Sequence, residues 1–298
     1  MRPRPIRRAT ATPRIRTFRL MVGLAFGLSS TLAAMAPRAV RADEAGTHYT
    51  LALQLKREGK VAEAIAECQK AIQTRPDYAA AHLTLGNLYR GQGDYAKAVA
   101  EFEATVKLQP KDALAHANLG AAYVRLKRVD DGIRELEAAL AIKPDDYEAR
   151  VSLGFAYKQK GDYKHAIENL QKATETKPDA AEAWTNLGIT KSKTDDRDGA
   201  VKALRKAISL RPDDADLHFD LAVVFRRDRK TDEAIAEYLL CLDKDPKHAP
   251  AYYDLGVLYS QEKKTAEAKQ AFENYLKYGT HEDAASRKEA EERLKSFK

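Results

Sequence analysis

Four histidines recur in this 298-residue sequence with a spacing that raises the question of metal binding. They are His48, His82, His116 and His218, and the intervals between them are all multiples of 34 residues. A single metal ion holds its histidine nitrogens at about 2 Å, whereas side chains on successive packed helix pairs lie at least about 8–10 Å apart. We therefore expect these histidines to be structural packing residues, and we predict no metal site.

The only two cysteines, Cys68 and Cys241, could suggest a disulfide if the chain is exported. They fall on core-facing positions of helices that are five repeats apart, so one chain cannot bring them to bonding distance. Buried, unreactive thiols are expected instead.

Motifs for catalysis were sought along the whole chain. The sequence contains no phosphate loop, no serine in a glycine-flanked elbow, and no Cys or His cluster with metal-ligand spacing. The repeats described next leave no span in which a catalytic domain could fold. We expect no enzymatic activity and no cofactor.

An internal repeat organises most of the sequence. Prolines recur every 34 residues, at Pro76, Pro110, Pro144, Pro178, Pro212 and Pro246. If position 1 of the repeat is Ala45, these prolines occupy position 32, position 7 is always Leu, and positions 8 and 20 are always Ala or Gly. Such agreement at one period predicts a stack of identical structural units.

Each repeat has the pattern of two antiparallel helices. Large apolar residues recur at helical spacing at positions 4, 7 and 11, and again at positions 17, 21, 24 and 28. Between these blocks, Gly93 can adopt the left-handed conformation that ends one helix, and Asp94 can cap the next. Small residues at positions 8, 20 and 27 allow close helix packing, and Pro at position 32 ends the second helix.

These positions resemble the tetratricopeptide repeat, and the segment Ala-Glu-Ala-Trp-Thr-Asn-Leu-Gly at 181–188 matches its pattern nearly letter for letter. The resemblance implies an all-α, right-handed solenoid of antiparallel helix pairs. Seven repeats are expected at 45–78, 79–112, 113–146, 147–180, 181–214, 215–248 and 249–282. Residues 283–298 are expected to form a polar C-terminal capping helix, opened by a capping box at 280–283 with Arg287 outward and Leu294 and Phe297 inward.

The fifth repeat departs from the pattern. It has Lys191, Asp195 and Arg197 at positions 11, 15 and 17, where Tyr, Gly and Tyr are usual in this family. Packing between its two helices should therefore be looser, and we predict that this repeat opens first.

The basic charge of the chain is confined to its N-terminus. The chain has 51 Lys and Arg against 44 Asp and Glu, but nine of the Arg fall in residues 1–42, which contain no acidic residue, and this leaves 42 basic against 44 acidic residues in 43–298. A near-neutral body cannot supply the field that sequence-independent phosphate binding requires. We expect no nucleic-acid partner.

Residues 1–42 have the pattern of an export signal. An arginine-rich stretch is followed by the uncharged segment 20–36 and then by Ala39-Val40-Arg41-Ala42, which fits cleavage after Ala42. We expect an exported protein, periplasmic or extracellular. The alternative is an uncleaved leader that anchors the repeats to the inner membrane, since 17 apolar residues are at the short limit for a membrane span.

In this family the concave surface is lined by the first helix of each repeat, so the resemblance places the binding site there. Polar groups at positions 6 and 9 could bond the backbone of an extended peptide, and we select Asn87, Asn118, Ser152, Asn186, Asp220 and Asp254. An apolar strip is expected from Tyr49, Leu83, Phe155, Phe219 and Tyr253. Positions 12 and 13 supply a basic rim that includes Arg90, Arg125, Lys158 and Arg226.

The basic rim has two interpretations that the sequence leaves open. It could recognise a partner, or it could consist of solvated cations that complement helix dipoles. Some family members clamp a partner's terminal carboxylate, but Leu83, Glu148 and Ser152 stand where that clamp needs cations.

The resemblance implies a protein-binding scaffold, and an envelope, secretion or pilus assembly is the expected setting. The alternative is a self-associating structural solenoid held to the membrane by its leader, with a homo-oligomer as its functional form. The sequence identifies no partner.

Overall fold

The computed structural model describes residues 38–280 and 284–297, with side chains described from residue 44 onward. In this part of the chain the structure is helical throughout and contains no strand. The helices are α2 (Arg38–Arg57), α3 (Val61–Thr74), α4 (Ala79–Gly91), α5 (Tyr95–Leu108), α6 (Ala113–Arg125), α7 (Val129–Ile142), α8 (Tyr147–Lys160), α9 (Tyr163–Thr176), α10 (Ala181–Lys191), α11 (Arg197–Leu210), α12 (Ala215–Arg227), α13 (Thr231–Lys244), α14 (Ala249–Gln261), α15 (Thr265–Tyr278) and α16 (Ala284–Ser296).

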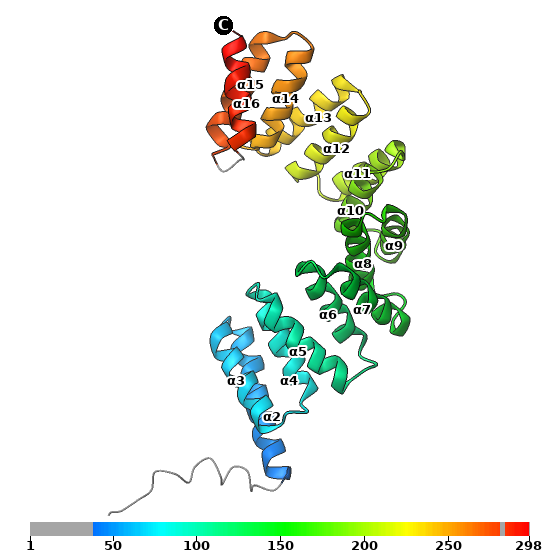
Figure 1. Ribbon diagram of the computed structural model, residues 1–298, viewed down its shortest axis with the longest axis vertical. Helices are drawn as coiled ribbons and strands as arrows, with labels where there is room; N and C mark the ends of the chain where they lie inside the picture. The colour runs from blue at the N-terminus through cyan, green and yellow to red at the C-terminus, as the bar shows by residue number, and fades with distance from the viewer. Residues whose placement is uncertain (1–37, 281–283, 298) are drawn as a thin grey trace, which may run out of the picture.

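Successive helices form antiparallel pairs that stack into a curved solenoid, as Figure 1 shows. We call the even-numbered members, α2 to α14, helices A, and the odd-numbered members, α3 to α15, helices B. In the middle of the molecule, α6, α8 and α10 lie on the inside of the curve, and α7, α9 and α11 lie on the outside (Figure 1). The expected α-solenoid fold is confirmed.

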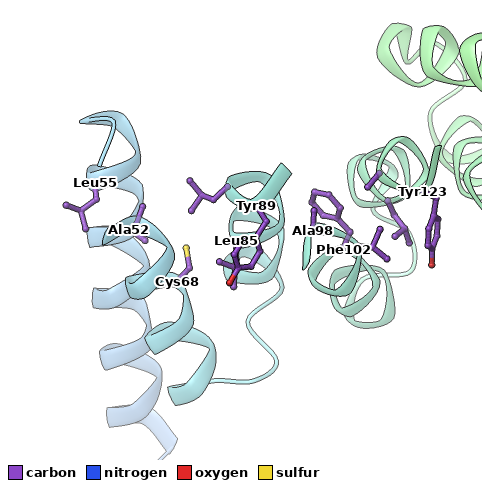
Figure 2. Close-up of a cluster of buried hydrophobic side chains, with 13 residues drawn as sticks. Ala52, Leu55, Cys68, Leu85, Tyr89, Ala98, Phe102 and Tyr123 are labelled. Atoms are coloured by element: carbon purple, nitrogen blue, oxygen red, sulfur yellow. The ribbon is translucent and has the colours of Figure 1, made fainter. Parts of the chain in front are cut away.

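Close packing within each pair depends on the small residue at position 8. A Cβ atom on Gly86 would lie 2.6 Å from the ring of Phe102, and one on Gly154 would lie 2.6 Å from Leu170. These partners occupy position 24 of the same repeat and are fully buried. Figure 2 shows the resulting N-terminal cluster, in which Phe102 packs between its own repeat and the next. Leu and Phe at position 24 therefore require Gly at position 8.

The turn between helices A and B uses a left-handed residue at position 15. Gly93 has φ 79°, and Asp94 accepts a hydrogen bond from the backbone N–H of Lys97, as predicted. In three other repeats a non-glycine residue takes this conformation, with φ 64° for Lys127 and similar values for Arg229 and Lys263. These three repeats therefore keep the geometry of the turn without glycine, at a cost in backbone strain, whereas Asp195 of the fifth repeat does not take the left-handed conformation.

Position 4 ties five of the helices A to the proline turn that precedes them. Side chains of four different types donate a hydrogen bond to the carbonyl oxygen of the proline six residues earlier. They are His82 to Pro76, His116 to Pro110, Arg150 to Pro144, Trp184 to Pro178 and Tyr252 to Pro246. This bond satisfies a carbonyl group at the junction of two repeats, so position 4 does more than fill space.

The position-4 histidines also pair with helix B of their own repeat. The Nδ1 atom of each lies 2.6–2.7 Å from a glutamate at position 23, in the pairs His48 and Glu67, His82 and Glu101, His116 and Glu135, and His218 and Glu237. Where position 4 is Arg150, Trp184 or Tyr252, position 23 is Asn or Ala. The histidines are structural, but their role is an ion-pair contact between helices as well as packing.

The solenoid ends at its C-terminus in α16, the expected capping helix. Ala290 is fully buried, and Leu294 and Phe297 pack against the last helix pair. Arg287 was expected to point outward, but its guanidinium donates hydrogen bonds to the carbonyls of Leu276 and Gly279 at the end of α15. Most of the proposed capping box at 280–283 lies outside the described residues.

At the N-terminus, α2 begins at Arg38, so the predicted leader lies outside the described residues except for its last five positions. No helix of residues 38–280 or 284–297 combines the length and apolar character that a membrane span needs. Leu51, at position 7 of the first repeat, is 41% exposed, whereas Leu85 at the same position of the second repeat is 2% exposed. Helices of the preceding repeat cover this position everywhere else.

The fifth repeat has a shorter helix A than its neighbours, because α10 has 11 residues and ends at Lys191. The ammonium group of Lys191 lies 2.7 Å from a carboxylate oxygen of Asp196, the residue that caps α11. A charged contact thus replaces the usual tyrosine packing, and early opening of this repeat stays a prediction.

Candidate functional site

A hollow of about 310 Å³ lies on the inner face where three helices A meet. Its walls come from α6, α8 and α10, and they combine an apolar floor with polar groups at the edge. The lining residues are Ala121, Val124, Arg125, Val151, Ser152, Phe155, Glu182 and Asn186. Four of the predicted site residues, Arg125, Ser152, Phe155 and Asn186, therefore meet in one hollow. Whether they bind a ligand stays a prediction.

The apolar floor was only partly identified from the sequence. Ala121 and Val151 occupy positions 9 and 5, which the family pattern assigns to the groove, but small side chains gave little reason to select them. Phe155 is half-buried and supplies the aromatic surface between them. The floor fits an apolar side chain of moderate size.

Lys158 contacts Phe155, one of the residues that line this hollow. Its ammonium nitrogen is 5.0 Å from the centre of the Phe155 ring, a cation–π contact. Loss of water around the ammonium group, together with repulsion from Lys193, lowers the pKa of Lys158, and attraction from Asp220 opposes that shift. The structure therefore places a partly desolvated cation next to a second cation on the concave face.

Asp220, from α12, faces this group from the next part of the groove. Burial raises the pKa of the Asp220 carboxyl to about 6, with further contributions from the nearby carboxylates of Asp216 and Asp214. Lys158 partly opposes this shift.

The first half of the basic rim carries cations without carboxylate partners. Within residues 44–280 and 284–297, no carboxylate oxygen lies within 4.0 Å of the charged groups of Arg90, Arg125, Lys158 or Lys193. The guanidinium of Arg125 lies 5.2 Å from the centre of the Tyr95 ring. Arg90 and Lys193 are exposed.

The rim is different in the sixth and seventh repeats. Arg226 lies 3.4 Å from a carboxylate oxygen of Asp254, and the Tyr238 hydroxyl donates a 2.6 Å hydrogen bond to the same carboxylate. Asp254 is thus a buried internal partner of Arg226 and Tyr238. Whether Arg226 contacts a ligand stays a prediction.

Four of the remaining predicted residues are engaged in internal contacts. The amide nitrogen of Asn87 donates to the carbonyl of Leu83, whose side chain packs on the N-terminal core. The Tyr49 hydroxyl lies 3.2 Å from that of Thr84. The Phe219 ring packs against Tyr238 and His248.

Asn118 and Tyr253 complete the predicted set. Asn118 is only 8% exposed, so it offers little surface. The Tyr253 hydroxyl donates a 2.7 Å hydrogen bond to Glu289 of the capping helix, which explains why this groove position is covered. The predicted residues that remain accessible are therefore concentrated in the second to fifth repeats.

The cysteines have no part in this surface. Both are free and buried, as expected. Burial raises the pKa of Cys68 to about 11 and that of Cys241 to about 12. Cys68 lies between the first two helix pairs (Figure 2), far along the solenoid from Cys241. Within residues 44–280 and 284–297, no three His, Cys, Asp or Glu side chains are grouped as a metal site would need.

Comparison with known families agrees with the stacked helix pairs and the 34-residue period. Four tetratricopeptide-repeat family models match the sequence, at residues 43–111, at 83–147 with 191–249, at 156–195 and at 237–270. The chain belongs to the tetratricopeptide-repeat family. Proteins of this family generally act as scaffolds for other proteins.

Several solved structures of tetratricopeptide-repeat proteins are similar. A protein from Parabacteroides merdae aligns with a TM-score of 0.64 and 18% identity over 86% of this chain and 99% of its own. MamA from Desulfovibrio magneticus RS-1 aligns with a TM-score of 0.54 and 26% identity over 57% of this chain and 96% of its own.

YrrB, described as having an unusual peptide-binding site, aligns with a TM-score of 0.53 and 21% identity over 66% of this chain and 97% of its own. No match was found among curated protein sequences.

Proposed function

We propose that this protein is a non-enzymatic scaffold that binds an extended segment of a partner protein in its concave groove. The observation that carries this proposal is the hollow formed by three successive helices A, because a side chain that enters it contacts three repeats at once. Ser152 and Asn186 lie at its edge, where their polar groups can bond a partner's backbone. The peptide-binding description of YrrB, a protein of the same fold, adds support.

A capture experiment tests the groove directly. Wild-type protein and a Phe155→Arg variant are crosslinked to partners in cells of the source organism and purified under identical conditions. Because the arginine fills the apolar floor, we expect the specific partner bands to be lost. The matched control is Asn169→Ala, which changes a helix B residue outside the groove. Equal capture by wild type and Phe155→Arg would overturn the groove as the binding site.

We also propose that the protein is exported and works in the cell envelope. The support is the leader pattern in residues 1–42, with its nine arginines, its apolar segment and its Ala39-Val40-Arg41-Ala42 sequence. Mass spectrometry of the N-terminus in fractionated cells tests this proposal. A soluble periplasmic form that begins at Asp43 is expected, while a full-length form in the membrane fraction would support the anchored alternative.

A further inference from the structure

An open cleft of about 820 Å³ lies on the edge of the solenoid that carries the proline turns. Its walls come from the turn between α5 and α6 and from the end of α7, and we call it the turn cleft. The side chains that matter here are Pro110, Lys111, Asp112, Leu114, Ile142 and Lys143. The turn cleft shares no lining residue with the hollow over Phe155, so it is separate from the proposed groove.

The turn cleft exposes aliphatic side chains that the repeat pattern does not require. Leu114 is 54% exposed and Ile142 is 41% exposed, and Leu108 at the end of α5 is exposed as well. Leu114 and Ile142 occupy positions 2 and 30 of the third repeat, and no other repeat has a large aliphatic residue at both positions. Position 2 is Glu or Asp in the next three repeats. The third repeat therefore has an apolar surface of its own at this edge.

A second apolar surface lies on α13, the helix B of the sixth repeat. Leu239 and Leu240 are 49% and 43% exposed. They occupy positions 25 and 26, and position 25 is Gln, Glu or Arg in every other repeat. Ala236, one turn before them, is also exposed, so the three residues form a continuous strip along one side of the helix. We call it the α13 strip.

Leu239 gives up a hydrogen bond that position 25 makes elsewhere. At three junctions the residue at position 25 bonds the hydroxyl of the tyrosine at position 11 of the next repeat, in the pairs Gln69 and Tyr89, Glu103 and Tyr123, and Glu137 and Tyr157. The seventh repeat also has a tyrosine at position 11, Tyr259, but a leucine cannot bond it. The contacts of the repeats with one another therefore do not explain a leucine at this position.

The two surfaces carry opposite charges. Exposed carboxylates flank the α13 strip on the same side of the helix, with Asp232 one turn before it and Asp243 one turn after it. Lys111 and Lys143 line the turn cleft. The acidic residue of the cleft, Asp112, caps α6 with two hydrogen bonds from backbone N–H groups. An acidic apolar strip thus stands on one part of the molecule and a basic apolar cleft on another.

Ion pairs within the chain leave this complementarity in place. The ammonium nitrogen of Lys143 lies 3.2 Å from a carboxylate oxygen of Asp146, and that of Lys244 lies 3.3 Å from Asp243. Lys143 and Asp243 are both exposed. Exposed ion pairs contribute little to stability, so these groups can exchange their present partners for contacts across an interface.

We propose that the α13 strip of one molecule docks in the turn cleft of a second copy of this chain. Leu239 and Leu240 then cover Leu114 and Ile142, and the carboxylates that flank the strip face the lysines of the cleft. The strip and the cleft are three repeats apart on one solenoid (Figure 1), so a molecule cannot join its own strip to its own cleft. This inference concerns surfaces outside the groove and does not depend on the proposed function.

The contact joins two different surfaces, so it is heterologous. Each molecule of a pair keeps one free strip or one free cleft, and further copies can add there. Association of this kind forms open chains or closed rings. Because neither surface includes a residue of the hollow, a second copy and a partner segment use separate parts of the molecule.

Mixing two variants tests the contact. Ile142→Glu disables the cleft, and Leu239→Glu disables the strip. Sedimentation equilibrium of the full-length chain over about a hundredfold range of concentration measures self-association. Wild type should associate as its concentration rises, and each variant alone should associate about 10-fold more weakly. An equal mixture of the two variants should form a one-to-one pair with the affinity of the wild-type contact, because one variant keeps an intact strip and the other an intact cleft.

Recovery in the mixture is the decisive result, since a contact between two identical surfaces does not produce it. Wild type that stays monomeric over the whole range would overturn the proposal. A mixture that associates no better than the separate variants would overturn it too. Circular dichroism shows whether each variant keeps its helices. Leu240→Gln and Leu114→Gln are milder changes of the same two surfaces, and they replace any variant that unfolds.

Leu51→Glu is the matched control for these substitutions. Leu51 is an exposed leucine at the N-terminal end of the solenoid and belongs to neither surface. Its substitution should leave self-association unchanged. If Leu51→Glu abolished association while Leu239→Glu and Ile142→Glu left it unchanged, the copies would stack end to end and the proposal would be overturned.

A charge reversal tests the orientation of the contact. Lys111→Glu should weaken self-association about 3-fold, because it places a carboxylate opposite the acidic ends of the strip. Lys172→Glu makes the same charge change at an exposed position of α9, outside both surfaces, and should have no effect. Equal losses in the two variants would reflect the net charge of the protein and overturn the proposal.

Discussion

The Nδ1 atom of His82 lies 2.6 Å from Oε2 of Glu101, and Nε2 of the same ring lies 3.0 Å from the carbonyl oxygen of Pro76. A carbonyl oxygen can only accept, so Nε2 carries a proton and donates it to Pro76. The close contact of Nδ1 with the Glu101 carboxyl group favours the protonated form of the ring. The hydrogen bond to Glu101 raises the pKa of His82, and the Pro76 carbonyl adds to this effect against the opposing effect of burial.

This arrangement predicts a pH dependence of stability. Because the pKa of His82 is raised in the folded protein, its protonation stabilises the fold. This contribution is fully present below the unfolded-state pKa of about 6.5, and it is lost as pH rises through the folded-state pKa. His82→Phe should lower the free energy of unfolding by about 1–3 kcal/mol at pH 6, and by less at pH 9. Urea denaturation at both pH values measures the difference.

His165 provides the matched control for this histidine prediction. It also lies 2.6 Å from a carboxylate, that of Asp162, but its side chain is 50% exposed and both residues belong to one helix end. An exposed pair contributes about 0–1 kcal/mol, so His165→Phe should have a small effect. A cost for His82→Phe that is the same at pH 6 and pH 9 would contradict the raised pKa of His82.

Asp220 should destabilise the protein at neutral pH. Its folded-state pKa of about 6 lies above the ordinary value of 3.8. The contribution of this carboxyl to the free energy of unfolding is therefore fully present below pH 3.8, and it is lost as pH rises through about 6. Asp220→Asn should raise the free energy of unfolding by about 1–2 kcal/mol at pH 7 and leave it unchanged near pH 3.5. Thermal unfolding at both pH values, with the exposed Asp213→Asn as control, checks this. A larger gain at pH 3.5 than at pH 7 would contradict the burial of the carboxyl.

The small residue at position 8 gives a stability prediction without charge. Gly154→Ala places a Cβ atom 2.6 Å from the Cγ atom of Leu170, inside the helix contact, and should destabilise the protein by about 1–3 kcal/mol. Gly91→Ala, in α4 with no neighbour within 4 Å of the new Cβ, should instead stabilise by up to about 1 kcal/mol. Guanidinium titration of both variants distinguishes them. The changes in the free energy of unfolding of the two variants should have opposite signs. If Gly154→Ala left this free energy unchanged, Leu170 would be able to move aside.

Substitution by glycine should stabilise the turns that have a left-handed non-glycine residue at position 15. Lys127 has φ 64°, and Lys127→Gly should stabilise the protein by about 0.5–1 kcal/mol, because relief of strain exceeds the added entropy of the unfolded chain. Gly93→Ala, at φ 79° in the equivalent turn, should destabilise it by about 1 kcal/mol. Differential scanning calorimetry of the two variants is the measurement. A lower melting temperature for Lys127→Gly would mean that its side chain stabilises the turn.

The fifth repeat should exchange its amide hydrogens first. Its α10 has 11 residues and ends at Lys191, whose ammonium group pairs with Asp196 at the position where four other repeats have a tyrosine. Hydrogen exchange followed by mass spectrometry should show faster exchange in residues 181–214 than in 113–180. Equal protection of the two regions would show that the lysine contact fully replaces the tyrosine.

The sequence predicted the fold well because the fold depends on local and repeated features. Leu at position 7, small residues at positions 8 and 20, and Gly93 with Asp94 each act within one repeat, so one period of 34 residues was enough to place the helices. The buried cysteines followed from the same pattern. The junction bond from position 4 was missed, because His, Arg, Trp and Tyr share no property in a sequence except the ability to donate. The joint occurrence of His at position 4 with Glu at position 23 was the signal that could have revealed the ion pairs.

The surroundings of the predicted site residues were harder to anticipate than the fold. Arg125, Ser152, Phe155 and Asn186 meet as a groove pattern implies, but Asp254 and Tyr253 are used internally, by Tyr238 and by the capping helix. A repeat pattern assigns the same environment to the same position of every repeat. At the ends of a solenoid the neighbouring element differs, so contacts with a terminal helix such as α16 cannot be predicted from the repeat pattern.

The exposed Leu51 and the polar cap α16 together limit how copies of this protein can associate. A fibre that grows head to tail needs two complementary ends, and α16 presents charged side chains where a following subunit would have to dock. Charged side chains at that end disfavour the stacking of a further copy onto α16. The apolar surface of Leu51 lies at the opposite end of the solenoid, so the two ends differ in chemical character.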